Sequence, residues 1–219
     1  MGNENPRIAV IVPSWNGEMD LRECVRSLYA QRDIDLELMV VDNGSTDGSV
    51  PYLEAEGVPH ISLPRNLGFA AAVNLGFAST EADAVVTVNS DTVLEPEALI
   101  RMHRVLTSDS RIGGVQPRIL SLVRGKHRDP ADPEAIIYSL GQALTADGRA
   151  REDGIGQRQG ERGFQARDIF GVCGAACMFK RSMLSELGGY DERYFAFYED
   201  VDLNVRARIM GWSFQVVPE

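Results

Sequence analysis

Hydrophobic runs alternate with amphipathic stretches along the first half of the chain. Residues 8–12 form a continuous apolar, β-branched run before Pro13, which is typical of a strand covered on both faces of a parallel sheet. Behind Asp20, a candidate N-cap, apolar residues then recur at helical spacing. The same order of patterns predicts further strands at 36–41, 60–63 and 84–88, with helices ending near 56 and 78 and another that Pro96 opens.

The last part of the chain continues this pattern. Strands are predicted at 175–179 and 214–217, and helices from about Ser182 and over 199–210. With 219 residues, of which 44% are hydrophobic, the chain can bury one substantial core. The alternation predicts an α/β, Rossmann-like fold whose mostly parallel central sheet is flanked by helices, with ligands beyond the carboxyl ends of the strands.

The charge balance narrows the classes of partner. Lys and Arg number 22 against 32 Asp and Glu, a net charge of −10, which disfavours a nucleic-acid partner. The same field repels an anionic small substrate, so a diphosphate ligand would need a cation or a local Arg. Only residues 118–167 reverse the sign, with nine Lys and Arg against seven Asp and Glu. That segment fits a loop or subdomain over an anionic ligand and equally a solvated hairpin.

Cysteines and apolar runs carry information on the compartment. The three cysteines, Cys24, Cys173 and Cys177, are too few for a disulfide framework and lack zinc-site spacing, so buried free thiols are expected. Neither a leader-type start nor an apolar run of about 18 residues occurs. The sequence therefore predicts a cytoplasmic location or one on the cytoplasmic face of a membrane.

Polar clusters follow two of the predicted strands. Residues 42–47 (Asp-Asn-Gly-Ser-Thr-Asp) would place a carboxylate and backbone amides at the ligand edge, although turn chemistry with Asp47 as an N-cap explains them equally well. Asn89-Ser90-Asp91 follows the fourth strand and offers oxygen ligands for Mg²⁺ or Mn²⁺. Its alternative is an ordinary turn before a helix.

A third cluster opens the last predicted helix. Glu199 and Asp200 follow the aromatic segment 194–198, and carboxylates in a first helical turn are favoured by the helix dipole in any case. Aromatic neighbours would also raise the pKa of a carboxyl group toward that of a general base. Together, the three clusters suit displacement at a sugar's anomeric carbon: base contacts, a metal for the leaving diphosphate and a carboxylate to deprotonate the acceptor.

In this order the motifs resemble the inverting glycosyltransferases of family 2 with the GT-A fold, in particular the rhamnosyltransferase-like group. The likeness covers nearly the whole chain. It is carried by residues 12–17 (VPSWNG), 41–47 (VDNGSTD), 65–69 (RNLGF), 89–91 (NSD), 188–191 (GGYD) and 198–203 (YEDVDL).

The resemblance implies a role for each motif. It implies a single domain over 1–219, with a nucleotide-sugar half at 7–117 and an acceptor and catalytic-base half, or subdomain, at 118–219. Asp91 would hold Mg²⁺ or Mn²⁺, and Asp200 would be the base in a single inverting displacement, with Glu199 beside it. The nucleotide-sugar pocket would be formed by Pro13, Asn16, Asp42, which meets the base, Asn66, Gly68, Asn89 and Ser90.

Two departures from the family pattern stand out. Asn89 replaces the first acid of the usual Asp-x-Asp motif, which implies weaker metal binding. The family's metal-binding His after the last strand has no counterpart, since the sequence stops at Glu219 and His60, His103 and His127 lie elsewhere. A C-terminally truncated chain is therefore expected.

The resemblance also suggests substrates. Rhamnose from a dTDP donor is favoured, a UDP donor is the alternative, and a glycan or lipid-linked acceptor of the cell envelope would bring the protein peripherally to the inner face of the membrane. Three other interpretations stay open: a sugar-phosphate nucleotidylyltransferase, a receiver-like module and a catalytically silent nucleotide-sugar-binding domain. The first two lack their expected motifs after the first strand.

Overall fold

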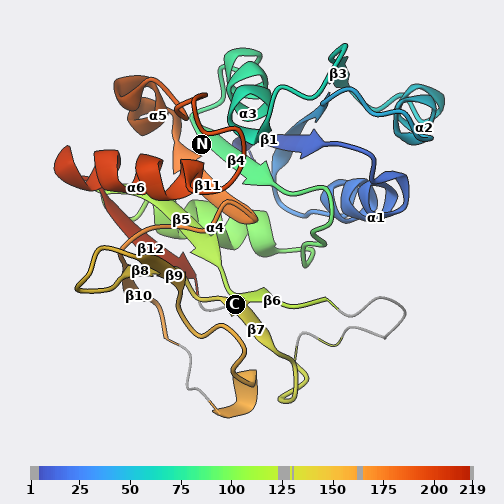
Figure 1. Ribbon diagram of the computed structural model, residues 1–219. Helices are drawn as coiled ribbons and strands as arrows, with labels where there is room; N and C mark the ends of the chain where they lie inside the picture. The colour runs from blue at the N-terminus through green and yellow to red at the C-terminus, as the bar shows by residue number, and fades with distance from the viewer. Residues whose placement is uncertain (1–4, 123–128, 130, 162–164, 218–219) are drawn as a thin grey trace.

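A sheet of eight strands forms the centre of the molecule (Figure 1). The computed structural model describes residues 5–122, 129, 131–161 and 165–217. The strand order is β10-β12-β5-β11-β4-β1-β2-β3. In chain order the bounds are β1 (Arg7–Ser14), β2 (Asp35–Asp42), β3 (His60–Ser62), β4 (Ala84–Val88), β5 (Ile112–Pro117), β10 (Arg167–Ile169), β11 (Ala176–Lys180) and β12 (Ser213–Val217).

Six of these strands point the same way. β3, β2, β1 and β4 pair in parallel, and β12 pairs in parallel with β5. β11 lies antiparallel between β4 and β5, and β10 is antiparallel to β12 at the edge. The predicted mostly parallel α/β sheet is confirmed, with one antiparallel strand from late in the sequence inserted at its middle.

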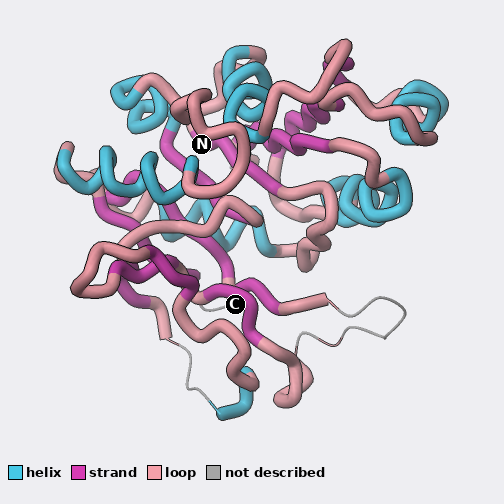
Figure 2. Tube along the Cα trace, in the orientation of Figure 1, coloured by secondary structure: helices cyan, strands magenta, loops and turns pink. Residues whose placement is uncertain are grey.

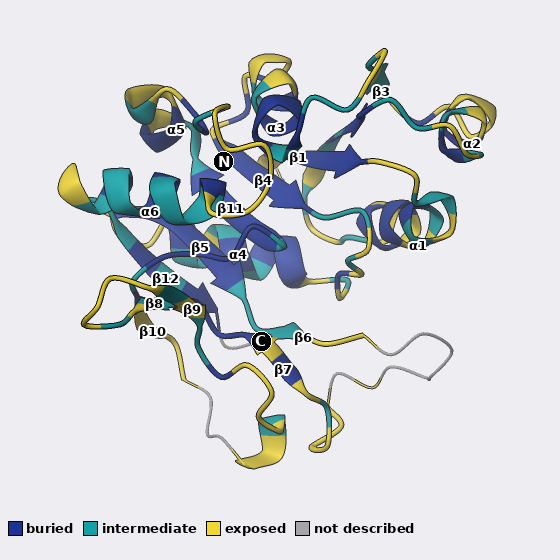
Figure 3. Cartoon of the chain, in the orientation of Figure 1, coloured by how far each residue is buried: buried dark blue, intermediate teal, exposed yellow. Residues whose placement is uncertain are grey.

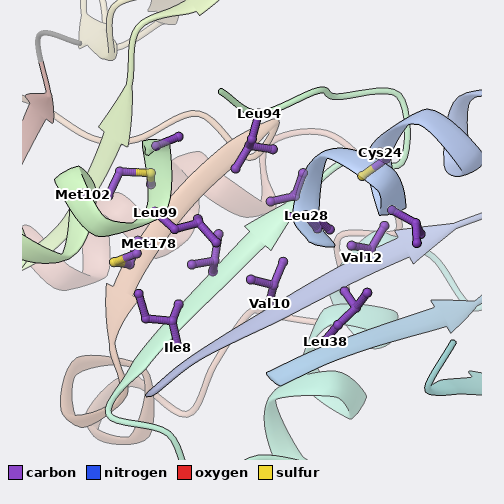
Figure 4. Close-up of a cluster of buried hydrophobic side chains, with 14 of the residues drawn as sticks. Ile8, Val10, Val12, Cys24, Leu28, Leu38, Leu94, Leu99, Met102 and Met178 are labelled. Carbon is purple, nitrogen blue, oxygen red and sulfur yellow. The ribbon is translucent and has the colours of Figure 1, made fainter. Parts of the chain in front are cut away.

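Helices cover both faces of the sheet (Figure 2). Ile8, Val10 and Val12 of β1 face one core, while Ile11 faces the other, which explains the unbroken apolar run of this strand. Figure 4 shows part of the first core, in which Leu28 and Leu99 meet β1. That core takes residues from α1 (Glu18–Tyr29), α2 (Ser49–Ala55) and α4 (Ala98–Leu106), and the second from α3 (Phe69–Ala78), α5 (Arg181–Leu187) and α6 (Glu199–Ile209).

Two predicted details are wrong, and one strand was not predicted. α1 begins at Glu18 behind Gly17, so Asp20 lies inside its first turn and is not the N-cap. Pro96 precedes α4, which begins at Ala98. β5 was not expected, because it contains Gly113 and Gly114, residues that weaken a strand signal. A Cβ on Gly114 would lie 2.8 Å from Phe179 Cδ1, so glycine makes room for this packing.

The locally basic segment folds into small hairpins next to the main sheet (Figures 1 and 3). β6 (Ile119–Leu120) pairs with β7 (Ile137–Ser139), and β8 (Gln142–Leu144) pairs with β9 (Ala150–Glu152). A short 3₁₀ helix spans Gln159–Glu161. Within the described residues, no helix has both the length and the apolarity that crossing a membrane requires.

Candidate active site

The first turn of α6 carries two carboxyl groups behind an unusual stretch of backbone. Phe197 and Tyr198 both have φ +69°, the left-handed region that non-glycine residues rarely occupy. Two such residues in succession store strain that the surrounding structure must hold. The chain turns sharply there and delivers Glu199 and Asp200 to the beginning of the helix.

Asp200 is fixed by three hydrogen bonds. Its Oδ2 accepts from Gln142 Nε2 at 2.8 Å and from the Gly174 N–H at 2.9 Å, and its Oδ1 accepts from the Val201 N–H at 2.7 Å. Burial nevertheless raises its pKa above that of an ordinary Asp, against the lowering effect of these hydrogen bonds. The group is thus both positioned and made more basic.

Glu199 is more strongly perturbed. Its side chain is 7% exposed, and its Oε2 has no hydrogen-bond partner in the described part of the chain. Burial, with a further contribution from the charge of Asp200, raises the pKa of Glu199 to about 7. The predicted rise in pKa is therefore seen for both carboxyl groups. The aromatic residues contribute less cover than expected, since Phe195 and Phe197 are 57% and 83% exposed.

Both carboxyl groups line a cavity of about 450 Å³. Its wall is assembled from distant segments: the turn before α6, the β8–β9 hairpin, the loop before β11 and the end of β4. Arg151 is the only Lys or Arg among its lining residues and makes no ion pair within the described chain. The lining also includes Phe69, Asn89, Tyr138, Glu152, Phe197 and Tyr198.

The Asn89-Ser90-Asp91 segment lies at the same rim. Asn89 lines the cavity, and Asp91 is exposed. Among the described residues, none of the three side chains takes part in a hydrogen bond. Burial first, and then nearby acids that include Asp91 and Asp200, raise the pKa of Tyr138. The Tyr138 phenol is thus within electrostatic reach of both acids, which belong to motifs more than 100 residues apart.

The loop after β1 is tied to the loop after β2. Asn16 has φ +50°, its Oδ1 accepts from the Thr46 N–H at 2.8 Å, and its N–H donates to Ser45 Oγ at 2.9 Å. Asp47 Oδ1 and Oδ2 accept from the first N–H groups of α2 and α1, at 3.0 and 3.1 Å. Asp47 therefore accepts from both helix N-termini, but the N-cap residues are Gly17 and Gly48, so the prediction that Asp47 is itself an N-cap is wrong.

Asp42 ends β2 in a buried position. It is 1% exposed, its Oδ2 accepts from the Ser45 N–H at 3.0 Å, and its Oδ1 is buried without a partner in the described chain. Pro13, also buried, lies opposite Val41 in the neighbouring strand. An uncompensated carboxylate oxygen at the ligand edge is costly unless a ligand or water satisfies it.

The loop that contains Asn66 and Gly68 contacts both Asn43, which follows β2, and Phe195, which lies before α6. Asn43 holds it, donating to the Gly68 carbonyl at 3.0 Å and accepting from the Leu67 N–H at 2.8 Å, while Asn66 accepts from the Gly68 N–H at 2.8 Å. Gly68 has φ +94°, and a Cβ there would lie 2.4 Å from the Phe195 carbonyl oxygen. Only glycine fits this close approach.

Several residues of the cavity have no counterpart among the predicted ones. Gln142 and Glu152 come from the β8–β9 hairpin, and Cys173 precedes β11. No periodicity or short motif marks them, because their proximity to Asp200 arises only from the folded chain. His60 lies in β3 and His103 in α4, neither of them among the cavity residues, and burial lowers the pKa of His103. His127 and Glu219 lie outside the described residues.

Fold and site together define the class of protein. The family model described as "Glycosyl transferase family 2" matches residues 9–188, so the chain belongs to this family, as the motifs indicate. Membership in this family supports neither the nucleotidylyltransferase interpretation nor the receiver-module interpretation.

Individual relatives are distant. The N-acetylglucosaminyl-diphospho-decaprenol L-rhamnosyltransferase of Mycobacterium tuberculosis is 25% identical over 96% of this chain and 73% of its own length. The solved mannosyltransferase of Pyrobaculum calidifontis, in complex with GDP-Man and Mn²⁺, shares 21% identity and a TM-score of 0.66 over 97% of this chain and 57% of its own. Residues 1–349 of Staphylococcus aureus TarS, solved in complex with UDP, share 18% identity with this chain and a TM-score of 0.67. The match covers 97% of this chain and 58% of that one. The two structures establish the GT-A fold.

Proposed function

We propose that this chain is an inverting glycosyltransferase that moves a sugar from a nucleotide diphosphate to a hydroxyl group of an acceptor. One observation carries the proposal: Asp200, buried enough to have a raised pKa and held by three hydrogen bonds, lines a cavity at whose rim Asp91 is exposed. The cavity offers one fixed base and a strand-end oxygen cluster, as a single displacement requires.

Asp200 acts as the general base in this mechanism. The acceptor oxygen forms a bond to the anomeric carbon while the bond from that carbon to the diphosphate oxygen breaks, and the electron pair leaves with the nucleotide diphosphate. The acceptor hydroxyl proton passes to Asp200. Attack from the face opposite the leaving group inverts the anomeric centre. Glu199, with its pKa near 7, is largely protonated at slightly acidic pH and adds little competing charge there.

Asn89, Ser90 and Asp91 are the proposed metal ligands. Their side-chain oxygen atoms take part in no hydrogen bond in the described chain, and hard divalent cations prefer oxygen ligands. Asp91 belongs to no group of three acidic, His or Cys ligands there, so substrate oxygens or water would complete the coordination. Bound Mg²⁺ or Mn²⁺ would neutralise the charge that develops on the leaving diphosphate.

The donor half of the proposed site covers residues 7–117. Asp42 would accept from the nucleotide base with its unpartnered oxygen, and Pro13, Asn16, Asn66 and Gly68 would shape the pocket beside it. The hydrogen bond of Asn16 to the loop after β2, and that of Asn66 within its own loop, favour a supporting role for these two side chains.

The acceptor half covers residues 118–219. Phe197 and Tyr198 expose aromatic rings at the cavity, which suit stacking on a sugar ring, and Arg151 suits an anionic group of the acceptor. The mycobacterial relative is named for a lipid diphosphate acceptor. By this analogy we favour dTDP-rhamnose as the donor, a lipid-linked or glycan acceptor of the cell envelope, and peripheral association with the inner membrane face.

A donor panel tests the proposal. The protein would be incubated with dTDP-rhamnose, UDP- and GDP-sugars, Mn²⁺ and a diphosphate-linked N-acetylglucosamine lipid, and the product analysed by mass spectrometry and NMR. We expect transfer with inverted anomeric configuration from at least one donor. Binding of nucleotide without transfer or donor hydrolysis would favour the silent binding domain, and a retained configuration would reject the mechanism.

A further inference from the structure

We propose that Glu152, a residue of the basic hairpin segment, is a positioning residue that holds Asp200 through Gln142 and keeps a negative charge beside it during proton transfer. This inference rests on the proposed role of Asp200 as the base. It assigns to the β8–β9 hairpin a task beyond shaping the cavity.

A single amide group links the two carboxyl groups. Gln142 Nε2 donates to Asp200 Oδ2 at 2.8 Å and to Glu152 Oε1 at 3.2 Å. Gln142 is 4% exposed, so these contacts are shielded from water. Each hydrogen of the amide is therefore used by one carboxylate, and a movement of Glu152 is transmitted to Asp200.

The orientation of that amide is set from its other end. Asn204 lies on α6 one turn after Asp200 and is fully buried. Its Nδ2 donates to Gln142 Oε1 at 2.9 Å and to the Val172 carbonyl at 2.8 Å. Because the Gln142 oxygen must face Asn204, its nitrogen must face the two carboxylates.

Glu152 is held from its far side as well. Ser139 Oγ donates to Glu152 Oε2 at 2.5 Å. The Ser139 Oγ atom in turn accepts from Gln116 Nε2 and from the Gly141 N–H, both at 3.1 Å. The hydroxyl has only one proton, which those two donors direct toward Glu152. Both Glu152 oxygens thus face donors, an arrangement that a carboxylate satisfies and a Gln side chain does not.

The charge of Glu152 acts on the same proton as its hydrogen bonds. A negative neighbour favours the protonated form of a carboxyl group, and so it increases the proton affinity of Asp200. Burial, with a smaller contribution from Asp200, raises the pKa of Glu152 itself. The titratable groups that face Asp200 are Glu199 on its own helix, Glu152 on β9, Tyr138 on β7, the thiols of Cys173 and Cys177, and Tyr190.

A cation is a poorer occupant of this cluster than the hydrogen-bond network. Ligand atoms of Glu152, Cys173 and Asp200 do lie within 4.8 Å of one another. However, the carboxylate oxygens already accept hydrogen bonds from Gln142, Ser139 and Gly174, and burial raises the pKa of the Cys173 thiol, which disfavours the thiolate a metal needs.

The test compares Glu152→Gln with Glu152→Asp in the transfer assay. For Glu152→Gln we expect kcat to fall about tenfold or more, donor affinity by calorimetry to stay within about twofold, and the acid limb of kcat/KM to move to lower pH, since Asp200 loses its negative neighbour. Glu152→Asp keeps the negative charge but cannot reach both Gln142 and Ser139. We therefore expect kcat to fall while the acid limb of kcat/KM stays at the wild-type pH. Glu134→Gln, an exposed carboxylate of the same segment, is the control and should match the wild type.

The outcomes separate this inference from the proposed function. If the wild type transfers no sugar with any donor, the proposed function fails. If the wild type is active and Asp200→Asn is inactive, yet Glu152→Gln retains the wild-type kcat and acid limb, only the role of Glu152 is wrong. Should Glu152→Gln fail to fold by circular dichroism, wild-type kcat in Glu152→Asp would overturn the inference, and a roughly tenfold loss with an unmoved limb would support it.

Discussion

Two regions use their polar side chains in opposite ways: the proposed donor edge, around β1, β2 and β3, and the proposed base side, at α6 and the β8–β9 hairpin. Around β1, β2 and β3, Asn16, Asn43 and Asp47 bond to the backbone of neighbouring loops and brace them. At α6 and the β8–β9 hairpin, Asp200 and Glu152 are half-buried, and desolvation raises their pKa values. In the proposed mechanism, the first region would supply a rigid shape and the second would supply proton chemistry.

This difference shows why a polar motif at a strand end is an ambiguous signal. The side chains of Asn16 and Asn66 are hydrogen-bonded to loop backbone, whereas the side chains of Asn89, Ser90 and Asp91 take part in no hydrogen bond within the described chain. Binding at the donor edge would then depend on the few groups left over, such as the unpartnered oxygen of Asp42.

The largest expected effect belongs to the base side. Asp200→Asn removes the proton acceptor, so we expect kcat to fall by about 10²–10⁴-fold, the usual range for a general base. Donor binding, measured by calorimetry, should be nearly unchanged because the donor edge is intact. Asp202→Asn on the same helical turn is the control, and its activity should stay near normal. Near-normal transfer by Asp200→Asn would remove the contrast between the two regions.

The next effect concerns the loop that joins both regions. Gly68→Ala forces a side chain into φ +94°, ψ 166° and against the Phe195 carbonyl, so we expect a loss of about 2–4 kcal/mol in the free energy of unfolding. Gly57→Ala, at φ +64° in open space, should lose only about 1–2 kcal/mol. Urea unfolding of both variants measures the difference, and equal losses would mean that the close approach is unimportant.

A smaller effect is expected at Asp91, the proposed metal ligand after β4. Asp91→Asn removes the one carboxylate of its motif, so the affinity for UDP or dTDP with Mn²⁺ should fall about tenfold, or about 1.4 kcal/mol. Affinity with a chelator should not change. Glu95→Gln, an exposed acid in the same loop, is the matched control. Equal wild-type affinity with Mn²⁺ and with chelator would contradict the metal role.

The last effect is a pH dependence of the free energy of unfolding that arises from Glu199. Its pKa is raised from 4.5 to about 7, so the folded protein holds this proton more tightly than the unfolded chain does. The resulting stabilisation is complete below about pH 4.5 and is lost as the pH rises through 7. Glu199→Gln should therefore lack this decline and melt at a higher temperature than the wild type at pH 8. Parallel melting curves of the two proteins from pH 5 to 8 would contradict the assignment.

The sequence predicts the central parallel strands β1 and β4 well, because they are buried on both faces and their sequences are unbroken apolar runs. β4 was expected at 84–88, as observed. β5 was missed since Gly113 and Gly114 leave space for large side chains elsewhere, a demand that no local pattern reveals. For 118–167 a hairpin was one of two interpretations, but its individual strands were not located because they are only two or three residues long.

The residues of the candidate site also differ in how far the sequence could predict them. Asp91, Asp200 and Glu199 could be selected because each follows a recognisable strand, turn or helix start. Gln142 and Glu152 could not, because Gln142 bonds to Asp200 across 58 residues and Glu152 is linked to Asp200 only through Gln142. A buried network of this kind becomes visible only when the fold brings its members together.

The position of β11 has a consequence for how the chain folds. β4 and β5 are neighbours in sequence, but β11, made of residues 176–180, separates them in the sheet. During synthesis the ribosome releases the β1–β4 half long before the strand that must pair with β4, so one edge of that half stays open. We expect the pairing of strands so far apart in sequence to make folding slow. While the edge of β4 is still exposed, the nascent chain is expected to need a chaperone.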